Sequence, residues 1–316
     1  MSAAVGNAPV QFAPTASQLD MAYSVCRSIA RSAAKNFYYG FAVLPRRKRN
    51  ALSAVYAFMR RCDDITDDNT QSPQSPQERH NKLAEWLDKV HRALAGYPTD
   101  DPVMLALTDA QRSFQIPVGL LDQLAFGTAA DLEYGSQDPS FAAPLVARYQ
   151  TFEELRQYCY GVASVVGLVC IKIFGYRDPA AEPLAEHCGL AFQLTNIIRD
   201  VKEDAAMGRV YFPQEDLEQF GLSAADLARQ PVDLSRVRPL LALEADRARE
   251  GYIAGGQLVS LVNEDSQPAL WVLINIYRRL LEKIAANEYD VFSERVQLSV
   301  REKLSVMGKG ILKRLV

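Results

Sequence analysis

Residues 189–204 read Gly-Leu-Ala-Phe-Gln-Leu-Thr-Asn-Ile-Ile-Arg-Asp-Val-Lys-Glu-Asp, and this stretch decides the fold class. Five of its residues recur at spacings of four, three, four and four and form a polar stripe: Gly189, Gln193, Asn196, Asp200 and Asp204. This is the period of one helical face, with large apolar residues on nearly every other side. Such a stripe costs free energy unless something satisfies it. The alternative, the solvent face of an ordinary amphipathic helix, fits these apolar flanks poorly.

The same three- and four-residue spacing of apolar residues continues through most of the chain, and alternating strand patterns are scarce. Prolines are predicted to stand where helices begin, at Pro45, Pro76, Pro102, Pro117, Pro179, Pro213, Pro239 and Pro268. We expect about ten helices and no sheet. The sequence predicts one all-α domain over residues 21–316, preceded by a flexible tail at residues 1–20.

Composition narrows the function classes. The chain has 316 residues, 48% of them hydrophobic, and a net charge of −3, which excludes a disordered chain and argues against a nucleic-acid binder. Five cysteines without a C-x-x-C pair indicate reduced thiols and a cytoplasmic protein. The longest uncharged apolar stretch, residues 158–171, is too short to span a bilayer, and contact with a membrane surface stays open.

A second acidic cluster follows another apolar helix. Asp63-Asp64-Ile-Thr-Asp67-Asp68 places four carboxylates in six residues, where the negative end of a helix disfavours them. If the helix continues, Asp63 and Asp67 lie one turn apart on a stripe that includes Tyr56 and Arg60. Paired carboxylates at this spacing suit Mg²⁺. The alternative is a solvated acidic loop; an EF-hand is excluded because its glycine and its twelfth-position glutamate are missing.

The two clusters are most simply explained as two walls of one metal-bearing cavity. Bound Mg²⁺ would offset the carboxylate repulsion and attract a polyphosphate, which Arg60 and Arg199 could also grip. The helix over residues 158–174 offers an apolar side that includes Tyr158 and Val162. Its small residues either leave room for a long chain or only permit close helix packing. This chemistry favours ionisation of an allylic diphosphate in a pocket that excludes water.

With these motifs in place, the sequence resembles the squalene/phytoene synthase family. The resemblance covers about residues 25–305 and is carried by six segments in order: 36–39 with 44–45, 56–67, 158–167, 193–204, 208–213 and 289–292. It implies an all-helical isoprenoid-synthase bundle around a central cavity. It also implies a Mg²⁺-dependent prenyltransferase that joins two prenyl diphosphates head to head.

The resemblance also implies roles for individual residues. The metal ligands would be Asp63, Asp64, Asp67, Asn196, Asp200 and Asp204. The catalytic residues, some of them ligands as well, would be Tyr56, Asp63, Asp67, Tyr158, Gln193, Asp200, Asp204 and Tyr277. Substrate contacts would come from Phe37, Phe41, Arg60, Val162, Arg199 and Arg295. One departure is Asn36, where many members of the family place serine before the phenylalanine.

The exact product is a separate question. Residues 173–176 and 211–221 are most similar to bacterial hopanoid-pathway enzymes, so we expect condensation of two farnesyl diphosphates to presqualene diphosphate. NADPH is needed only if the reaction continues to squalene. The alternative is a phytoene synthase of carotenoid biosynthesis, acting on two geranylgeranyl diphosphates. Head-to-tail synthases and terpene cyclases fit less well because of the Asn-x-x-x-Asp-x-x-x-Asp form of the stripe and the block at residues 158–167. A non-catalytic assembly factor fits less well because every metal-ligand position is filled. The oligomeric state is not indicated.

Overall fold

The computed structural model describes residues 12–33, 35–66, 74–130 and 145–312. Within these ranges the chain forms fourteen α-helices, one π-helical turn (η1) and no strand. The elements are α1 (Ala16–Ala33), α2 (Lys35–Val43), α3 (Arg46–Thr66), α4 (Pro76–Leu94), α5 (Pro102–Phe114), α6 (Val118–Ala129), α7 (Phe152–Cys159), η1 (Tyr160–Ser164), α8 (Val165–Phe174), α9 (Ala181–Ala206), α10 (Gln214–Gln219), α11 (Ala224–Ala228), α12 (Leu234–Leu261), α13 (Gln267–Ala286) and α14 (Val300–Leu312). The all-α prediction is confirmed.

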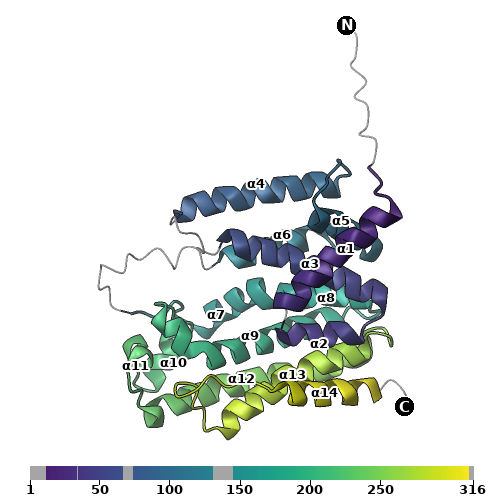
Figure 1. Ribbon diagram of the computed structural model, residues 1–316. Coiled ribbons are helices and arrows are strands. Elements are labelled where there is room, and N and C mark those ends of the chain that lie inside the picture. The colour runs from purple at the N-terminus through teal and green to yellow at the C-terminus, as the bar shows by residue number, and fades with distance from the viewer. Residues whose placement is uncertain (1–11, 34, 67–73, 131–144, 313–316) are drawn as a thin grey trace.

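The helices lie in successive layers (Figure 1). Helix α4 covers α3, α5 and α6 on one side, while α12, α13 and α14 form the opposite side. Between them, α9 packs most extensively against α12 and also contacts α8 and η1. One continuous cluster of buried apolar side chains connects these layers, so α9 lies deep within the bundle.

Three expectations about the elements need correction. The helix count was too low, because α10 and α11 have only six and five residues, too few to show a period. Pro239 does not begin a helix but lies inside α12. The predicted tail at residues 1–20 was too long, since α1 begins at Ala16 and the backbone N–H of Phe12 donates to the Gly96 carbonyl at 3.0 Å.

Residues 158–171 were predicted to be too short to span a bilayer, but the helix that contains them is longer than this stretch. The stretch belongs to a continuous helix over Phe152–Phe174, whose 23 residues are long and apolar enough to cross a membrane by length and composition alone. However, 44% of its most apolar window is buried inside the fold, where η1 and α8 pack against α6 and α9. Core helices of globular proteins pass the same test, so this helix is weak evidence for a membrane span.

Candidate functional site

Helix α9 is held closely from two sides. A Cβ atom on Gly189 would lie 2.6 Å from the Cα of Ser164 in η1, and one on Gly251 of α12 would lie 2.5 Å from the His187 carbonyl oxygen. On the buried side of α9, the hydroxyl groups of Thr195 and Tyr252 share a 2.5 Å hydrogen bond. Only glycine permits such close backbone approach, so these contacts fix the direction of the polar stripe.

The small residues lie in η1 and in the first turn of α8. A Cβ atom on Gly167 would lie 2.8 Å from the Ala185 carbonyl oxygen, so this glycine serves close helix packing. A Cβ atom on Gly161 would meet nothing within 4 Å. The neighbouring Val162 lines an internal cavity. Close helix packing is therefore confirmed at Gly167, while room for a long chain stays a prediction.

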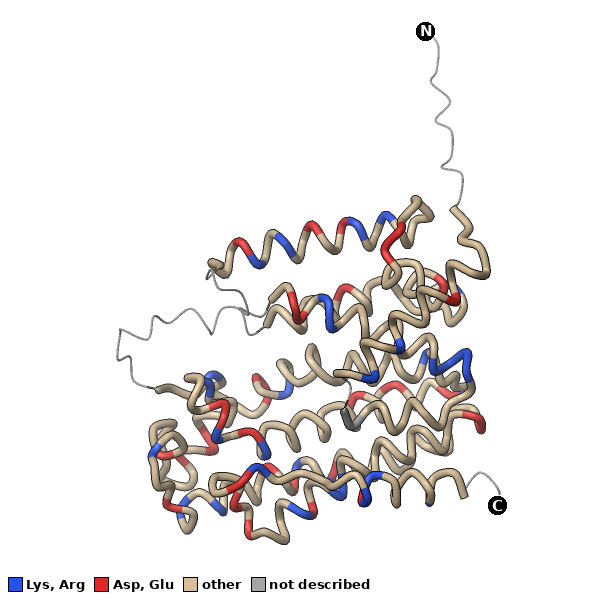
Figure 2. The backbone as a smooth tube through the Cα atoms, viewed as in Figure 1, with Lys and Arg blue, Asp and Glu red and all other residues tan. Residues whose placement is uncertain are grey.

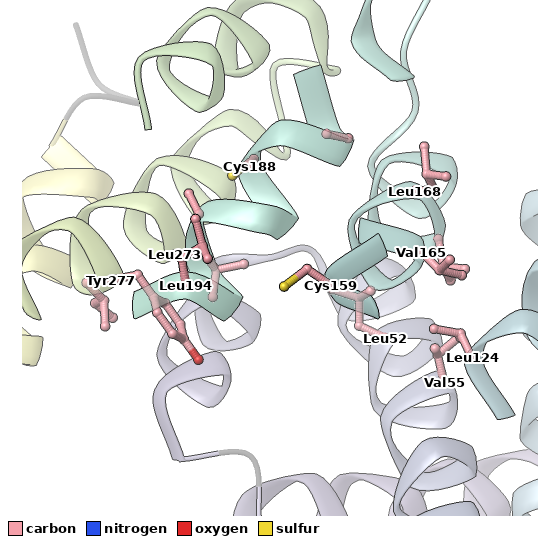
Figure 3. Packing of buried hydrophobic residues seen from close by; sticks show 14 of the residues in the cluster. Leu52, Val55, Leu124, Cys159, Val165, Leu168, Cys188, Leu194, Leu273 and Tyr277 are labelled. Carbon is pink, nitrogen blue, oxygen red and sulfur yellow. The ribbon is translucent and has the colours of Figure 1, made fainter. Parts of the chain in front are cut away.

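This first cavity, which we call the apolar cavity, has a volume of about 260 Å³ and lies between α2, α3, η1, α8, α9 and α13. Its wall is mostly aliphatic and aromatic and includes Phe37, Phe41, Val162 and Cys170. Figure 3 shows part of the surrounding packing, with Leu52 and Val55 on one side and Cys188 and Leu273 on another. Gln193 and Asn196 are its polar members from α9.

A second cavity of about 300 Å³, the basic cavity, adjoins the first. The two share Phe37, Tyr56 and Asn196 in their walls. The basic cavity adds three cationic side chains, Arg199, Arg295 and Lys303, together with Tyr277. An anionic group and an apolar chain of one ligand could therefore be bound side by side.

Asp200 is tied to the basic cavity by two guanidinium groups. Arg199 donates from Nε at 2.7 Å and from Nη2, and Arg295 donates from Nη2 at 2.6 Å and from Nε at 2.9 Å. Burial alone would raise the pKa of the Asp200 carboxyl. The two arginines outweigh burial, so its pKa lies below the usual value and the group remains a carboxylate.

The polar stripe of α9 contains one oxygen atom that is free to bind a cation. The buried Oδ1 of Asn196 has no hydrogen-bond partner among the described residues, although it lies where the two cavities meet. A buried carbonyl oxygen left open at an anionic stripe is the donor type that Mg²⁺ takes. No group of three or more His, Cys, Asp or Glu side chains within the described part of the chain is arranged around a metal. The open Asn196 Oδ1 fits a cation ligand, whereas both oxygens of Asp200 accept hydrogen bonds from arginines, so the complete ligand set stays a prediction.

The acidic cluster that begins at Asp63 lies at the end of α3. Asp63 is half-buried and Asp64 is exposed, with Asp64 paired to Arg60 at 2.7 Å one turn earlier. Helix α3 ends at Thr66, and Asp67 lies outside the described residues. The pKa of Tyr56 is raised, chiefly by burial, with Arg60 opposing the shift and the two acids adding to it. Tyr56 therefore stays protonated at neutral pH.

A buried arginine supports this helix end. Arg79 of α4 is 9% exposed, and its Nη1 donates to the Thr66 carbonyl at 2.9 Å. A positive charge at a helix C-terminus offsets the negative end of the helix dipole and the acids that gather there. The acids are electrostatically unfavourable at this position, as the sequence predicts. The cation that compensates them was not predicted, because Arg79 belongs to the next helix, α4.

An aromatic cluster forms the wall between the cavities. Phe192 stacks on Tyr277 with ring centroids 4.3 Å apart, and the Phe37 ring lies 5.7 Å from that of Tyr277. Phe192 also lines the apolar cavity. In the sequence Phe192 is one of the apolar residues that flank the polar stripe. Its position directly before Gln193 is the signal that could identify it as a cavity residue.

The structure brings most of the predicted residues together, but not all. Phe37, Phe41, Tyr56, Val162, Gln193, Asn196, Arg199, Tyr277 and Arg295 line one or both cavities. Tyr158 lines neither; it stacks on Tyr211 with centroids 5.3 Å apart, and the Arg148 guanidinium lies 4.9 Å from its ring centroid. Arg60, Asp63, Asp64, Asp200 and Asp204 are also absent from these two linings, and the Asn36 side chain and Asp67 lie outside what the structure describes.

Comparison with known proteins identifies the class that this fold and site define. The family model for squalene/phytoene synthase matches residues 30–302, and the chain belongs to this family. It is a head-to-head prenyl diphosphate synthase, a prenyltransferase of isoprenoid biosynthesis.

Among individual relatives, a phytoene synthase of Mycobacterium tuberculosis is 36% identical over 298 residues, covering 93% of this chain and 92% of its own. A 15-cis-phytoene synthase of Synechococcus elongatus is 34% identical over 312 residues, covering 94% and 95%. Among solved structures, a dehydrosqualene synthase with bound ligand superposes with a TM-score of 0.80 at 28% identity, covering 95% and 98%. The squalene synthase HpnC from Alicyclobacillus acidocaldarius gives 0.74 at 30%, covering 87% and 97%.

These relatives overturn the expectation of presqualene diphosphate. Curated relatives at 31–36% identity are phytoene synthases, the stated alternative. The two segments behind the wrong choice serve packing: Phe174 is buried, and Gly175, at φ 75°, ends α8. Residues 211–221 form a turn and the short helix α10. Such constraints arise from the shared fold, so they carry little information about the product.

Proposed function

We propose that this protein is a phytoene synthase, which condenses two geranylgeranyl diphosphates head to head to phytoene. The proposal rests first on relatives of that name that cover nearly the whole chain. The structural observation that carries it is the pair of cavities joined at Phe37, Tyr56 and Asn196. One cavity suits an isoprenoid chain and the other suits its diphosphate.

The residue roles that we propose follow from this division. Arg199 and Arg295 donate to diphosphate oxygens in the basic cavity, and Arg60, currently paired with Asp64, lies on the α3 side. Phe37, Phe41 and Val162 line the path of the prenyl chain. The rings of Phe192 and Tyr277 present π-faces next to the place where an allylic cation would form, and they exclude water from it.

We further propose that Asn196, Asp200 and Asp204 hold Mg²⁺ on α9, and that Asp63, Asp64 and Asp67 do so at the end of α3. The bound cation would offset the charge of the diphosphate and stabilise it as a leaving group. Gln193 and the protonated Tyr56 remain as neutral hydrogen-bonding groups at the boundary of the apolar cavity. Tyr158, which lies in the Arg148–Tyr211 stack, would act from outside the two described cavities.

The test is product identification after incubation with Mg²⁺ and either geranylgeranyl or farnesyl diphosphate, each with and without NADPH. We expect phytoene from geranylgeranyl diphosphate, independent of NADPH, and no product when EDTA removes the cation. Exclusive use of farnesyl diphosphate would contradict the substrate assignment but leave the prenyltransferase class intact. Full turnover in EDTA would contradict the role of Mg²⁺.

A further inference from the structure

A third cavity, which we call the arginine cavity, lies between α1, α2 and α3. It has a volume of about 260 Å³ and is lined by Arg27, Arg31, Tyr38, Phe41, Arg49 and Ser53. Phe41 lines both this cavity and the apolar cavity, so the two are neighbours across one side chain. None of the three arginines has a role in the proposed condensation.

The charges in the arginine cavity are not balanced. None of its three arginines forms an ion pair with a carboxylate in the described ranges. Arg27 instead donates from Nη1 to the neutral Asn50 Oδ1 at 2.9 Å. The Arg31 guanidinium lies 5.9 Å from the centroid of the Tyr38 ring. By contrast, the exposed Arg46 on the same helix as Arg49 pairs with Asp20 at 3.1 Å.

The surroundings make this cluster more than a set of solvated surface cations. Arg27 and Arg49 are half-buried, and the neighbouring Asn50 and Ser53 are buried, at 8% and 2% exposure. The Ser53 hydroxyl donates to the Arg49 carbonyl at 2.8 Å, which fixes the α3 turn that carries Arg49. Like charges gathered around a partly desolvated cavity repel one another, and a bound anion would remove this cost.

We propose that the arginine cavity binds a phosphate-type oxyanion and is separate from the diphosphate site of the basic cavity. Guanidinium groups match the geometry of phosphate oxygens and are its preferred protein partners. The lining contains three cations and no acid, so an anionic group is expected. Inorganic diphosphate and the phosphate of an anionic lipid headgroup share this chemistry. Either would join α1 and α3 to Tyr38 of α2, the helix that also carries Phe37 and Phe41.

The experiment measures binding of inorganic diphosphate in EDTA by isothermal titration calorimetry, using the full chain. Four variants accompany the wild type: R27Q/R49Q, the charge-retaining R27K/R49K, the exposed control R46Q, and R199Q in the basic cavity. A parallel arm measures co-sedimentation with phosphatidylglycerol vesicles against phosphatidylcholine vesicles. Far-UV circular dichroism checks the helix content of each variant.

We expect R27Q/R49Q to weaken at least tenfold the component of diphosphate binding that R199Q leaves in place, with R46Q equal to wild type. R27K/R49K, which keeps the charges but not the guanidinium geometry, should show a smaller loss. If the wild type binds only the phosphatidylglycerol vesicles and R27Q/R49Q loses that binding, the site stands with a lipid phosphate as its ligand. Absence of both kinds of binding in the wild type overturns the proposal. Binding that R199Q abolishes and R27Q/R49Q retains also overturns it. If R27Q/R49Q does not fold, weaker binding in R27K/R49K than in R46Q supports the proposal, and equal binding in these two variants overturns it.

Discussion

Asp200 and Glu244 lie on α9 and α12, the two helices that pack most extensively against each other. Their environments shift the pKa of the two carboxyl groups in opposite directions. Asp200 receives hydrogen bonds from two arginines, and its pKa is lowered. Glu244 is fully buried and shares a single arginine, Arg247, with Asp216. Burial, with Asp216 adding to it and Arg247 opposing it, raises the pKa of Glu244 to about 8.

The difference shows that depth of burial and the number of cations per carboxylate together decide whether an acid stays charged. Arg247 donates from Nη1 and Nη2 to the two carboxylate oxygens of Asp216, and Glu244 keeps one oxygen without a partner among the described residues. Asp200 is bonded to Arg199 and Arg295, two residues that line the basic cavity, and is kept anionic. Glu244 is kept neutral in the core, where it accepts a hydrogen bond from Arg247.

The largest expected effect comes from removing the charged acid and comparing it with removal of the neutral one. Asp200→Ala should lower release of inorganic diphosphate from geranylgeranyl diphosphate by about 10²–10³-fold, because a preorganised group for the developing charge is lost. Glu244→Gln, which retains a hydrogen-bond donor toward Asp216, should stay within about threefold of wild type. Equal rates for Asp200→Ala and wild type, at unchanged helix content by circular dichroism, would remove Asp200 from the site.

Removing one of the two cations of Asp200 should have a smaller effect. Arg295→Gln should lower kcat/KM about 10- to 100-fold, which corresponds to one charge-assisted hydrogen bond of about 1.5–3 kcal/mol. The matched control is Arg249→Gln, which removes an arginine that pairs with the surface acids Asp246 and Glu282. If both variants lose activity equally, the pairing with Asp200 has no special role.

The acids at the end of α3 form a third region in which a cation lies close to carboxylates. The buried cation there is Arg79. Arg79→Gln should reduce the free energy of unfolding by about 1–3 kcal/mol, since the Thr66 carbonyl loses its donor. Arg92→Gln on the exposed face of the same helix should change it by less than about 0.5 kcal/mol. Urea unfolding followed by circular dichroism distinguishes them, and equal midpoints would show that Arg79 does not hold α3.

The last effect is a pH dependence of stability that originates at Glu244. Its pKa of about 8 in the folded state exceeds the value of about 4.3 expected for an unfolded chain. Between these values the folded state retains a proton that the unfolded state releases, so stability contributed by this group falls as pH rises from about 5 to 8.

Glu244→Gln removes this titration. Relative to wild type, the variant should gain at least about 1 kcal/mol of stability between pH 5 and pH 8, since one pKa unit corresponds to about 1.4 kcal/mol. Urea denaturation at both pH values provides the measurement. Parallel pH profiles for the two proteins would mean that Glu244 is ionised in the folded state, and the contrast with Asp200 would disappear.

Much of the site could be predicted from spacing. The stripe from Gly189 to Asp204 follows the helical period, and its members Gln193 and Asn196 indeed meet at the apolar cavity. Partners that come from distant segments could not be predicted this way. Arg295 lies 95 residues from Asp200, and Phe192 was hidden because an aromatic residue on an apolar helix is ordinarily part of the core.

By itself, the sequence determined the all-α class, the position of both acidic clusters and the family, because helical period and motif spacing are local properties of the chain. Only the tertiary structure decided which acids are charged and which cavity each side chain lines. It alone brought the three arginines around Phe41 together, because pKa values and cavities depend on side chains that meet across helices. In Figure 2 the basic and acidic residues are spread over most helices, and nothing in their order along the chain distinguishes a paired arginine from an unpaired one.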